Sequence, residues 1–225
     1  FPPRFWIGLA YPIYFGALAL LLGVELVGVT IQGSQRWLEL GPIRMQPSEF
    51  MKIALVLALA RFYHDLPADK VNSPFGLLTP LFFIGAPAAL ILNQPDLGTT
   101  VLLIATGVVM VFLSGLSWKI IAGAAGAAAV GIPVFLRFGL EDYQRARILT
   151  FLNPEDDPMG AGYHIMQSKI ALGSGGFTGR GFMEGTQSHL NFLPEKQTDF
   201  IFTMLGEEFG FVGGVAILLI YAIVL

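Results

Sequence analysis

Two carboxylates at the mouth of an apolar segment, Glu195 and Asp199, are the strongest candidates for chemistry in this sequence. They lie four residues apart in the stretch LPEKQTDF, and an apolar run follows it to the end of the chain. Carboxylates at the edge of a membrane helix are costly to desolvate and usually mark functional sites. Thr198 is expected to cap this helix, which places Asp199 in the first turn, where the helix dipole favours an ionised, proton-accepting carboxylate. A purely capping role for Asp199 fits the sequence equally well.

Further charged side chains gather in the first polar loop and the helix after it. The loop carries Arg36 and Arg44, and the helix carries Glu49 and Lys52. Because Glu49 and Lys52 are three residues apart, they share a helix face and are expected to neutralise each other inside the bundle. This pair is either a structural ion pair or part of a functional site.

Other polar residues have weaker claims to chemistry. The turn QPDLGT presents Asp96, which is expected as a turn or cap residue rather than a catalytic one. Arg145 and Arg147 serve either a site or the phosphates of membrane lipids. His164 and His189 have no partners at metal-ligand spacing, so no zinc site is expected.

The composition is that of an integral membrane protein. Of the 225 residues, 54% are hydrophobic and 13% are charged, and the net charge is −3. No basic cluster stands out, which argues against a nucleic-acid partner. The chain contains no cysteine, so disulfides and thiolate chemistry are excluded.

The hydropathy pattern predicts an all-α polytopic membrane protein with about six spans, because apolar runs long enough to cross about 30 Å of hydrocarbon recur along the chain. The expected spans are residues 6–31, 48–62, 75–92, 97–116, 120–138 and 199–225. The second is short and is expected to pack against protein. Pro80 and Pro87 predict a kink in the third, and the Gly- and Ala-rich fifth span is expected to be packed in the interior.

Residues 139–198 form a long polar loop, which we expect to be folded because it contains many apolar anchors. Residues 166–172 are expected to form a short amphipathic helix at the membrane interface. The glycines between 173 and 185 predict tight turns that bring backbone amides close to a ligand. We expect one transmembrane domain, 1–225, that includes this loop. It starts at FPP and stops within an apolar run, which predicts a fragment truncated at both ends.

Charge gives a weak indication of orientation. If the spans alternate, Arg61, Lys70 and Lys119 lie on the side opposite the long loop. Counting only short loops, the positive-inside rule places these three residues in the cytoplasm. The long loop and Asp199 are then expected outside.

Several long motifs resemble one known family. They are GSQRWLELGPIRMQPSEFMKIA (33–54), QPDLGT (94–99), YQRARILTFLNP (143–154), GAGYHIMQSKIALGSGGFTGRGF (160–182) and GTQSHLNFLPEKQTDFIFTMLGEEFGFVG (185–213). Together they resemble the SEDS family (shape, elongation, division and sporulation), and GTQS with PEKQTDF favours its RodA branch, the elongation type. The resemblance covers essentially the whole chain in the family's order. It implies about ten membrane helices, of which this chain lacks roughly the first two and the last two.

The resemblance implies a peptidoglycan glycosyltransferase that polymerises lipid II into glycan strands for cell-wall elongation and cell shape. The site would lie on the outer face of the bacterial cytoplasmic membrane, and a class B penicillin-binding protein, a transpeptidase, is the implied partner. The essential acid of the family corresponds to Asp199. The resemblance also marks five residues of the first loop and following helix as functionally important: Trp37, Arg44, Gln46, Glu49 and Lys52.

This chemistry requires a base for the attacking hydroxyl and positive charge for the leaving diphosphate. The cation candidates are Arg44, Arg145, Arg147 and Lys196, or a divalent cation such as Mg²⁺ or Mn²⁺. Two alternatives stay open. One is a lipid II flippase, which would need alternating access and which inverted repeats of hydropathy would favour. The other is a scaffold that binds and activates the transpeptidase.

Overall fold

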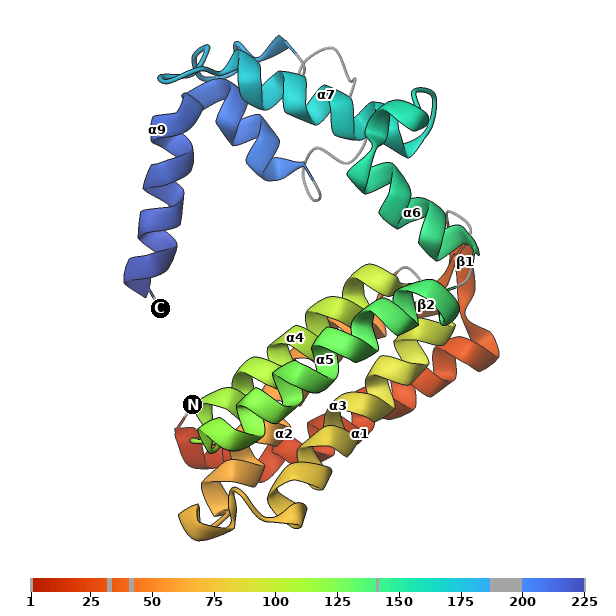
Figure 1. The fold of residues 1–225 in the computed structure, drawn as a ribbon, viewed down its shortest axis with the longest axis vertical. Coiled ribbons are helices and arrows are strands. Elements are labelled where there is room, and N and C mark those ends of the chain that lie inside the picture. Colours follow the sequence, from red (N-terminus) through yellow and green to blue (C-terminus); the bar gives the residue numbers. More distant parts are fainter. Residues whose placement is uncertain (1, 32–33, 41–42, 141, 187–199, 225) are drawn as a thin grey trace. The chain divides into compact units, whose positions relative to one another are not determined.

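The structure, a computed structural model, describes residues 2–31, 34–40, 43–140, 142–186 and 200–224 (Figure 1). It divides into two compact units, residues 1–133 and 134–225. The single transmembrane domain expected from the sequence stays a prediction; within the described residues, the contacts group the long loop with the last helix.

Unit 1 consists of helices with a small antiparallel sheet inserted after the first. The helices are α1 (Pro3–Val27), α2 (Pro47–Asp65), α3 (Pro74–Asn93), α4 (Leu97–Leu113) and α5 (Trp118–Phe138), which continues into unit 2, together with the short 3₁₀ turn η1 (Ala68–Lys70). The strands are β1 (Val29–Ile31), β2 (Ser34–Leu40) and β3 (Ile43–Met45), in the order β1-β2-β3. Each helix lies where an apolar run predicts one.

Four described helices are long and apolar enough to cross a membrane: α1, α3, α5 and α9 (Ile201–Val224). Four of the six expected spans thus meet this criterion of length and composition, and α2 and α4 do not. Helix α4 has 17 residues, or about 25 Å at 1.5 Å per residue, which is short of about 30 Å of hydrocarbon. Helix α2 carries charged residues at both ends. The polytopic, all-α membrane class is nevertheless confirmed.

Helix α2 lies at the centre of the core of unit 1. Its buried apolar residues recur at three- and four-residue intervals, and it supplies six of the fourteen described core residues. These six are Met51, Ala54, Leu55, Ala58, Leu59 and Phe62. They pack against residues of α1, α3 and α4, such as Leu21, Ile84 and Leu103. The prediction that this short segment packs against protein is confirmed.

Helix α3 runs through Pro80 and Pro87 without interruption. A proline has no backbone N–H, so each leaves the carbonyl four residues earlier without its helical donor. Tyrosine hydroxyls from neighbouring helices replace both donors. Tyr14 donates to the Phe83 carbonyl at 2.9 Å, and Tyr63 donates to the Gly76 carbonyl at 3.3 Å. The two prolines are tolerated because other helices satisfy the backbone.

Tyr14→Phe should lower the free energy of unfolding by about 1–3 kcal/mol, because the Phe83 carbonyl would be buried without a donor. The Tyr14 side chain is fully buried, so water cannot substitute for the hydroxyl. The measurement is denaturation of the full-length protein in detergent. Tyr221→Phe, at an exposed position of α9, is the control and should have no measurable effect. Equal stability of the two variants would contradict this account.

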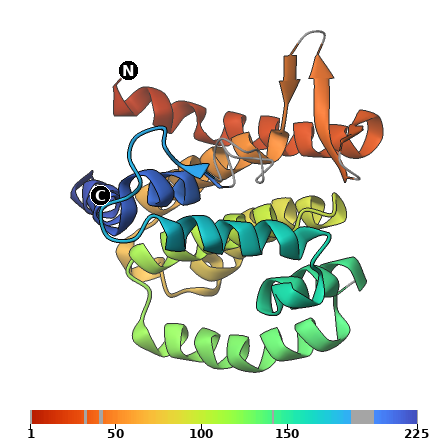
Figure 2. The ribbon, with the colours of Figure 1, turned by 90° about the horizontal axis from the view of Figure 1, so that it is seen from above.

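Helix α5 differs from its prediction. The small residues of this segment predict an interior helix, but none of its described residues is buried. In Figure 2 its ribbon runs clear of α1 and α2. The prediction is wrong for the described chain, because small side chains permit close packing but provide little apolar surface to drive it.

Unit 2 contains α6 (Asp142–Leu152), the 3₁₀ turn η2 (Pro154–Asp156), α7 (Ala161–Ser174) and α9. Helix α7 packs against α9, η2 and α6. The described part of the long loop is thus folded, as predicted. The helix expected at residues 166–172 lies within α7.

Helix α9 is broken at Gly210, where the backbone leaves the helical region with φ 64° (Figure 1). Residues 175–181, here called the glycine loop, bind both sides of the break. The Glu207 and Glu208 carbonyls accept from the amides of Arg180 and Gly181 at 3.0 and 3.1 Å. On the other side, the amides of residues 211 and 212 donate to the carbonyls of residues 176 and 177 at 3.0 and 3.1 Å. These four bonds replace the two helical bonds that the break removes.

The glycine loop therefore corrects one prediction. The sequence predicts that its amides face a ligand, whereas the amides of Arg180 and Gly181 donate to α9. The glycines are needed because a Cβ at Gly175 or Gly179 would collide with the α9 backbone. They permit a backbone-to-backbone contact, which is another common reason for glycine.

Candidate functional site

The sheet of unit 1 is fixed to the C-terminal end of α1 (Figure 2). Gln35 of β2 donates through Nε2 to the carbonyls of Val24 and Gly28, both at 3.0 Å, and so ties β2 to the last turn of α1 and to the residue that follows it. Strand β2 carries Arg36 and Trp37, and strand β3 carries Arg44. This end of unit 1, comprising β2, β3 and the first turns of α2 and α4, is called the hairpin end below.

Arg44 faces Glu39 across the β2–β3 pair. The antiparallel register pairs the two residues, and Arg44 Nε lies 2.7 Å from Glu39 Oε1. The Arg44 side chain is 66% exposed. An exposed ion pair of this kind contributes little stability, so Arg44 can exchange Glu39 for another anion at small cost.

Asp96 collects four donors at the hairpin end. Its Oδ1 accepts from the Thr99 amide at 3.1 Å, which is the helix cap that the sequence predicts. Its Oδ2 accepts from Thr99 Oγ1 at 2.9 Å, from Arg36 Nη1 at 3.1 Å and from Gln46 Nε2 at 3.3 Å. The prediction of a cap is confirmed, but it missed the contacts to Arg36 and Gln46, which lie far away in the sequence.

Glu49 and Lys52 form the predicted ion pair in the first turns of α2. Lys52 Nζ lies 2.9 Å from Glu49 Oε2, and the two side chains are 27% and 54% exposed, respectively. The prediction that they are buried inside the bundle is therefore wrong for the described chain. This face of α2 also exposes Phe50 and Ile53, and the local i,i+3 spacing is sufficient for the pair.

Glu49→Gln should change the free energy of unfolding of the full-length protein by less than about 1 kcal/mol, as expected for a partly exposed pair. The measurement is chemical denaturation in detergent, with Asp65→Asn as the control. Asp65 pairs with Arg61 at 2.6 Å in a similarly exposed i,i+4 pair at the other end of α2. A loss of about 3–5 kcal/mol would instead show that the full-length protein buries the Glu49–Lys52 pair.

The arginine candidates of unit 2 lie on α6. The exposed Arg145 donates through Nη2 to the Arg137 carbonyl at 2.8 Å, in the last turn of α5, where a cation is favourable. Arg147 lies on the same helix. A role for either arginine at a diphosphate stays a prediction.

A buried carboxylate in α9 was missed by the sequence analysis. Glu207 has no exposed surface and accepts from Thr186 Oγ1 at 3.3 Å. Thr186 Oγ1 accepts in turn from Arg180 Nη1 at 3.2 Å. The available signal was an acidic residue within an apolar span, which usually marks a functional or tightly bonded position.

The strongest sequence candidates, Glu195, Lys196 and Asp199, lie outside the described residues, as does the predicted cap Thr198. Their proposed roles stay predictions. Within the described ranges, no group of three or more His, Asp or Glu side chains is arranged to hold a metal ion. The described carboxylates therefore provide no three-ligand site for Mg²⁺ or Mn²⁺.

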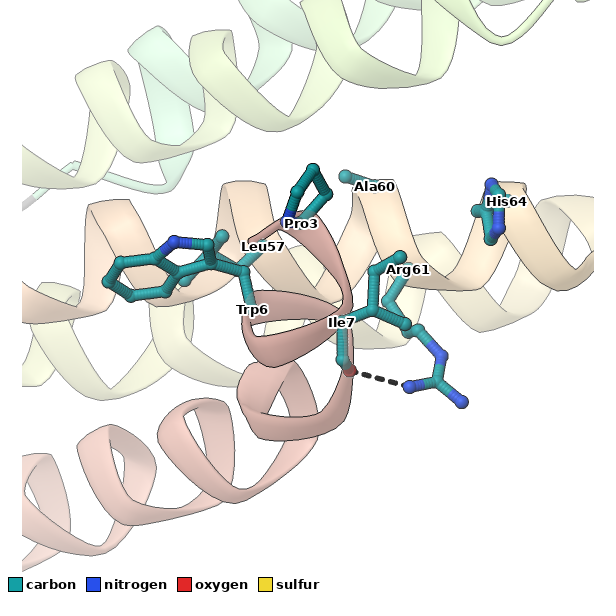
Figure 3. A pocket seen from close by; sticks show the side chains of 7 residues that line it. All are labelled: Pro3, Trp6, Ile7, Leu57, Ala60, Arg61 and His64. Carbon is teal, nitrogen blue, oxygen red and sulfur yellow. Dashed lines mark hydrogen bonds between the residues drawn. The ribbon is translucent and has the colours of Figure 1, made fainter. Parts of the chain in front are cut away.

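A pocket lies away from these candidates, at the opposite end of α1 and α2 (Figure 3). It has a volume of about 430 Å³ and is lined by Pro3, Trp6, Ile7, Leu57, Ala60, Arg61 and His64. Arg61 reaches from α2 to α1 and donates to the Ile7 carbonyl.

At this same end of unit 1, Asn72 accepts from the Ser117 amide at 2.8 Å, which joins the α2–α3 connector to the α4–α5 connector. The connector after α2 and the connector after α4 therefore lie at the same end of unit 1.

The chain is similar in sequence to known proteins. The peptidoglycan glycosyltransferase MrdB of Escherichia coli strain K12 is 46% identical over 224 residues, which cover 100% of this chain and 60% of MrdB. Stage V sporulation protein E of Bacillus subtilis strain 168 is 38% identical over 223 residues, covering 99% of this chain and 60% of that protein. The chain thus spans about 60% of the length of these relatives.

Solved structures show the same fold. A chain from the work described as "Structural coordination of polymerization and crosslinking by a peptidoglycan synthase complex" has a TM-score of 0.76 and 32% identity, covering 99% of this chain and 61% of that one. The rod shape determining protein RodA of Thermus thermophilus has a TM-score of 0.59 and 28% identity, covering 98% and 55%. The model of the FtsW/RodA/SpoVE family, described as cell cycle proteins, matches residues 1–225. The resemblance seen in the motifs is thereby confirmed, and the chain belongs to the FtsW/RodA/SpoVE family.

Proposed function

We propose that the full-length protein is a peptidoglycan glycosyltransferase that polymerises lipid II into glycan strands for cell-wall elongation and cell shape. The observation that carries this proposal is the 46% identity, over the whole chain, to a protein named peptidoglycan glycosyltransferase. The polar hairpin end of unit 1 supports it, because exposed cations and carboxylates gather there at the ends of apolar helices.

In the proposed reaction, a sugar hydroxyl of one lipid-linked glycan attacks the anomeric carbon of another. A new bond forms between the hydroxyl oxygen and that carbon, and the bond from the carbon to the lipid-linked diphosphate breaks. The hydroxyl proton passes to the Asp199 carboxylate, acting as general base. Direct displacement inverts the anomeric centre, so no covalent sugar–enzyme intermediate is required.

The leaving diphosphate needs positive charge, which is worth most in a site that excludes water. Arg44, Arg145, Arg147 and Lys196 are the proposed sources, and the exposed Arg44 is free to exchange its carboxylate partner. Trp37 and Glu195 are proposed to contact the sugars or the diphosphate. We assign no step to a divalent cation; polymerisation with Mg²⁺, with Mn²⁺ and with a chelator tests that requirement directly.

The proposed setting is the bacterial cytoplasmic (inner) membrane, with the site on its outer, periplasmic face. A class B penicillin-binding protein is the proposed partner, which would crosslink the strands. The description of a similar structure as part of a peptidoglycan synthase complex supports a partner of this kind.

The test is to incubate purified full-length protein, with its partner, with fluorescent lipid II and to resolve the products by gel electrophoresis. A ladder of glycan strands is expected. If lipid II placed inside vesicles instead reaches the outer leaflet without polymerising, the protein is a flippase. An unreacted substrate with intact partner binding would favour the scaffold function.

A further inference from the structure

The Asp96 carboxylate joins three elements of unit 1 that are distant in the sequence. It caps α4, pairs with Arg36 of β2 and binds Gln46 at the start of α2. The Asp96 side chain is 8% exposed, and that of Arg36 is 22% exposed. A cap alone needs only the bond to the Thr99 amide, so the other three bonds at Oδ2 require a separate explanation.

Arg36 depends on Asp96 for its charge compensation. Within the described part of the chain, Asp96 is the one carboxylate in ion-pair contact with Arg36, and Arg36 Nε is buried without a hydrogen-bond partner. Removing one member of a largely buried pair strands the other charge. This contact therefore holds β2, and with it the hairpin that carries Arg44, at a fixed place over α4.

Gln46 is the second residue that Asp96 holds. It is the N-cap residue of α2, but its side chain makes no cap bond, and its amide instead reaches Asp96. The Gln46 carbonyl accepts from the Glu49 amide at 3.1 Å, in the first turn that also leads to Lys52. Fixing Gln46 therefore fixes the start of the helix that presents the Glu49–Lys52 pair.

We propose that Asp96 is a positioning residue for glycosyl transfer: it aligns the hairpin and the first turn of α2, so that Arg44, Gln46, Glu49 and Lys52 face the substrate together. This inference rests on the proposed function. Asp96 itself acts through Arg36 and Gln46, with no contact to the reacting sugars required.

Two substitutions separate this role from helix capping. Asp96→Ser keeps an oxygen that caps α4, but it is too short to reach Arg36 and Gln46. Asp96→Glu keeps a carboxylate for both partners, but glutamate is a poor cap residue. We expect Asp96→Ser to lower kcat/KM for lipid II polymerisation by about 10–10²-fold, since a displacement of about 1 Å can have that effect. Asp96→Glu should retain clearly more activity, and the reverse order would overturn the proposal.

A further variant separates positioning from stability. Arg36→Gln combined with Asp96→Ser removes the stranded guanidinium, so the melting temperature should rise above that of Asp96→Ser, while kcat/KM stays low. If kcat/KM recovers together with the melting temperature, Asp96 serves stability alone.

The matched control is Ser73→Ala, which removes the cap of α3 at the far end of unit 1, where Ser73 Oγ accepts from the Gly76 amide at 3.2 Å. It should lower the melting temperature and leave kcat/KM unchanged.

Wild-type protein in the same assay distinguishes a failure of the proposed function from a failure of the positioning role of Asp96. If wild type makes no glycan strands, both the proposed function and this inference fail. If wild type polymerises lipid II and Asp96→Ser matches its kcat/KM, the function stands and the inference alone is overturned.

Discussion

Asp199→Asn should slow lipid II polymerisation by about 10²–10⁴-fold, the range expected when a general base is removed. Asparagine keeps the size of the side chain and much of its hydrogen bonding, but it cannot accept the hydroxyl proton. Partner binding and the melting temperature should therefore be retained. The measurement is the rate of glycan-strand formation by full-length protein with its partner, at saturating lipid II.

Two further variants locate the base within this segment. Asp199→Glu should recover little activity, because moving the carboxylate by about 1 Å can cost on the order of 10²-fold. Glu195→Gln is the comparison variant: it removes a nearby carboxylate that is proposed to contact the substrate but not to act as the base, so it should lose less activity than Asp199→Asn. Near-normal glycan synthesis by Asp199→Asn would overturn the assignment of Asp199 as the general base. A selective loss in Glu195→Gln would move the base four residues upstream.

Gly179→Ala should destabilise the full-length protein by at least about 1–3 kcal/mol, the usual range for a non-glycine residue held in a strained backbone conformation. Gly179 has φ +83°, and an added Cβ would also collide with the Glu208 carbonyl of α9. Relieving the collision would separate the glycine loop from the break in α9, where buried backbone groups would lose their partners. The measurement is thermal denaturation in detergent.

The control for this experiment is Gly173→Ala. Gly173 lies in α7, and a Cβ there meets nothing within 4 Å. Alanine should be neutral or should stabilise the helix by about 0.5–1 kcal/mol, because it restricts the unfolded chain. Equal melting temperatures for the two alanine variants would mean that the hydrogen bonds from the glycine loop to the α9 break do not stabilise the protein.

The positions of the helices could be predicted from the sequence, whereas their environments could not. Apolar runs bounded by prolines and polar turns place α1 to α5 within a few residues of the observed ends. Hydropathy does not report how many neighbours a helix has, so the exposure of α5 was missed. The break at Gly210 was missed as well, because glycine within an apolar run also serves close helix packing.

The same distinction holds for the candidate site: its local features could be predicted from the sequence, whereas its long-range contacts could not. The Glu49–Lys52 pair follows from local helix geometry and is confirmed, but its exposure depends on what surrounds α2. The Asp96 cap is likewise local. Its contact with Gln46 spans fifty residues of sequence and depends on how α2 and α4 pack, which no single-sequence pattern reports.

The tyrosine–carbonyl bonds of α3 have a consequence for how homologous sequences should vary. Tyr14 is needed at its position because Pro87 leaves the Phe83 carbonyl without a donor. Where a homologue replaces that proline, the helix supplies its own donor and the tyrosine hydroxyl becomes dispensable. Loss of the hydroxyl should therefore be tolerated only after, or together with, loss of the proline. Positions 14 and 87, and likewise 63 and 80, should then covary across the family, linking the substitutions in α3 to those in α1 and α2.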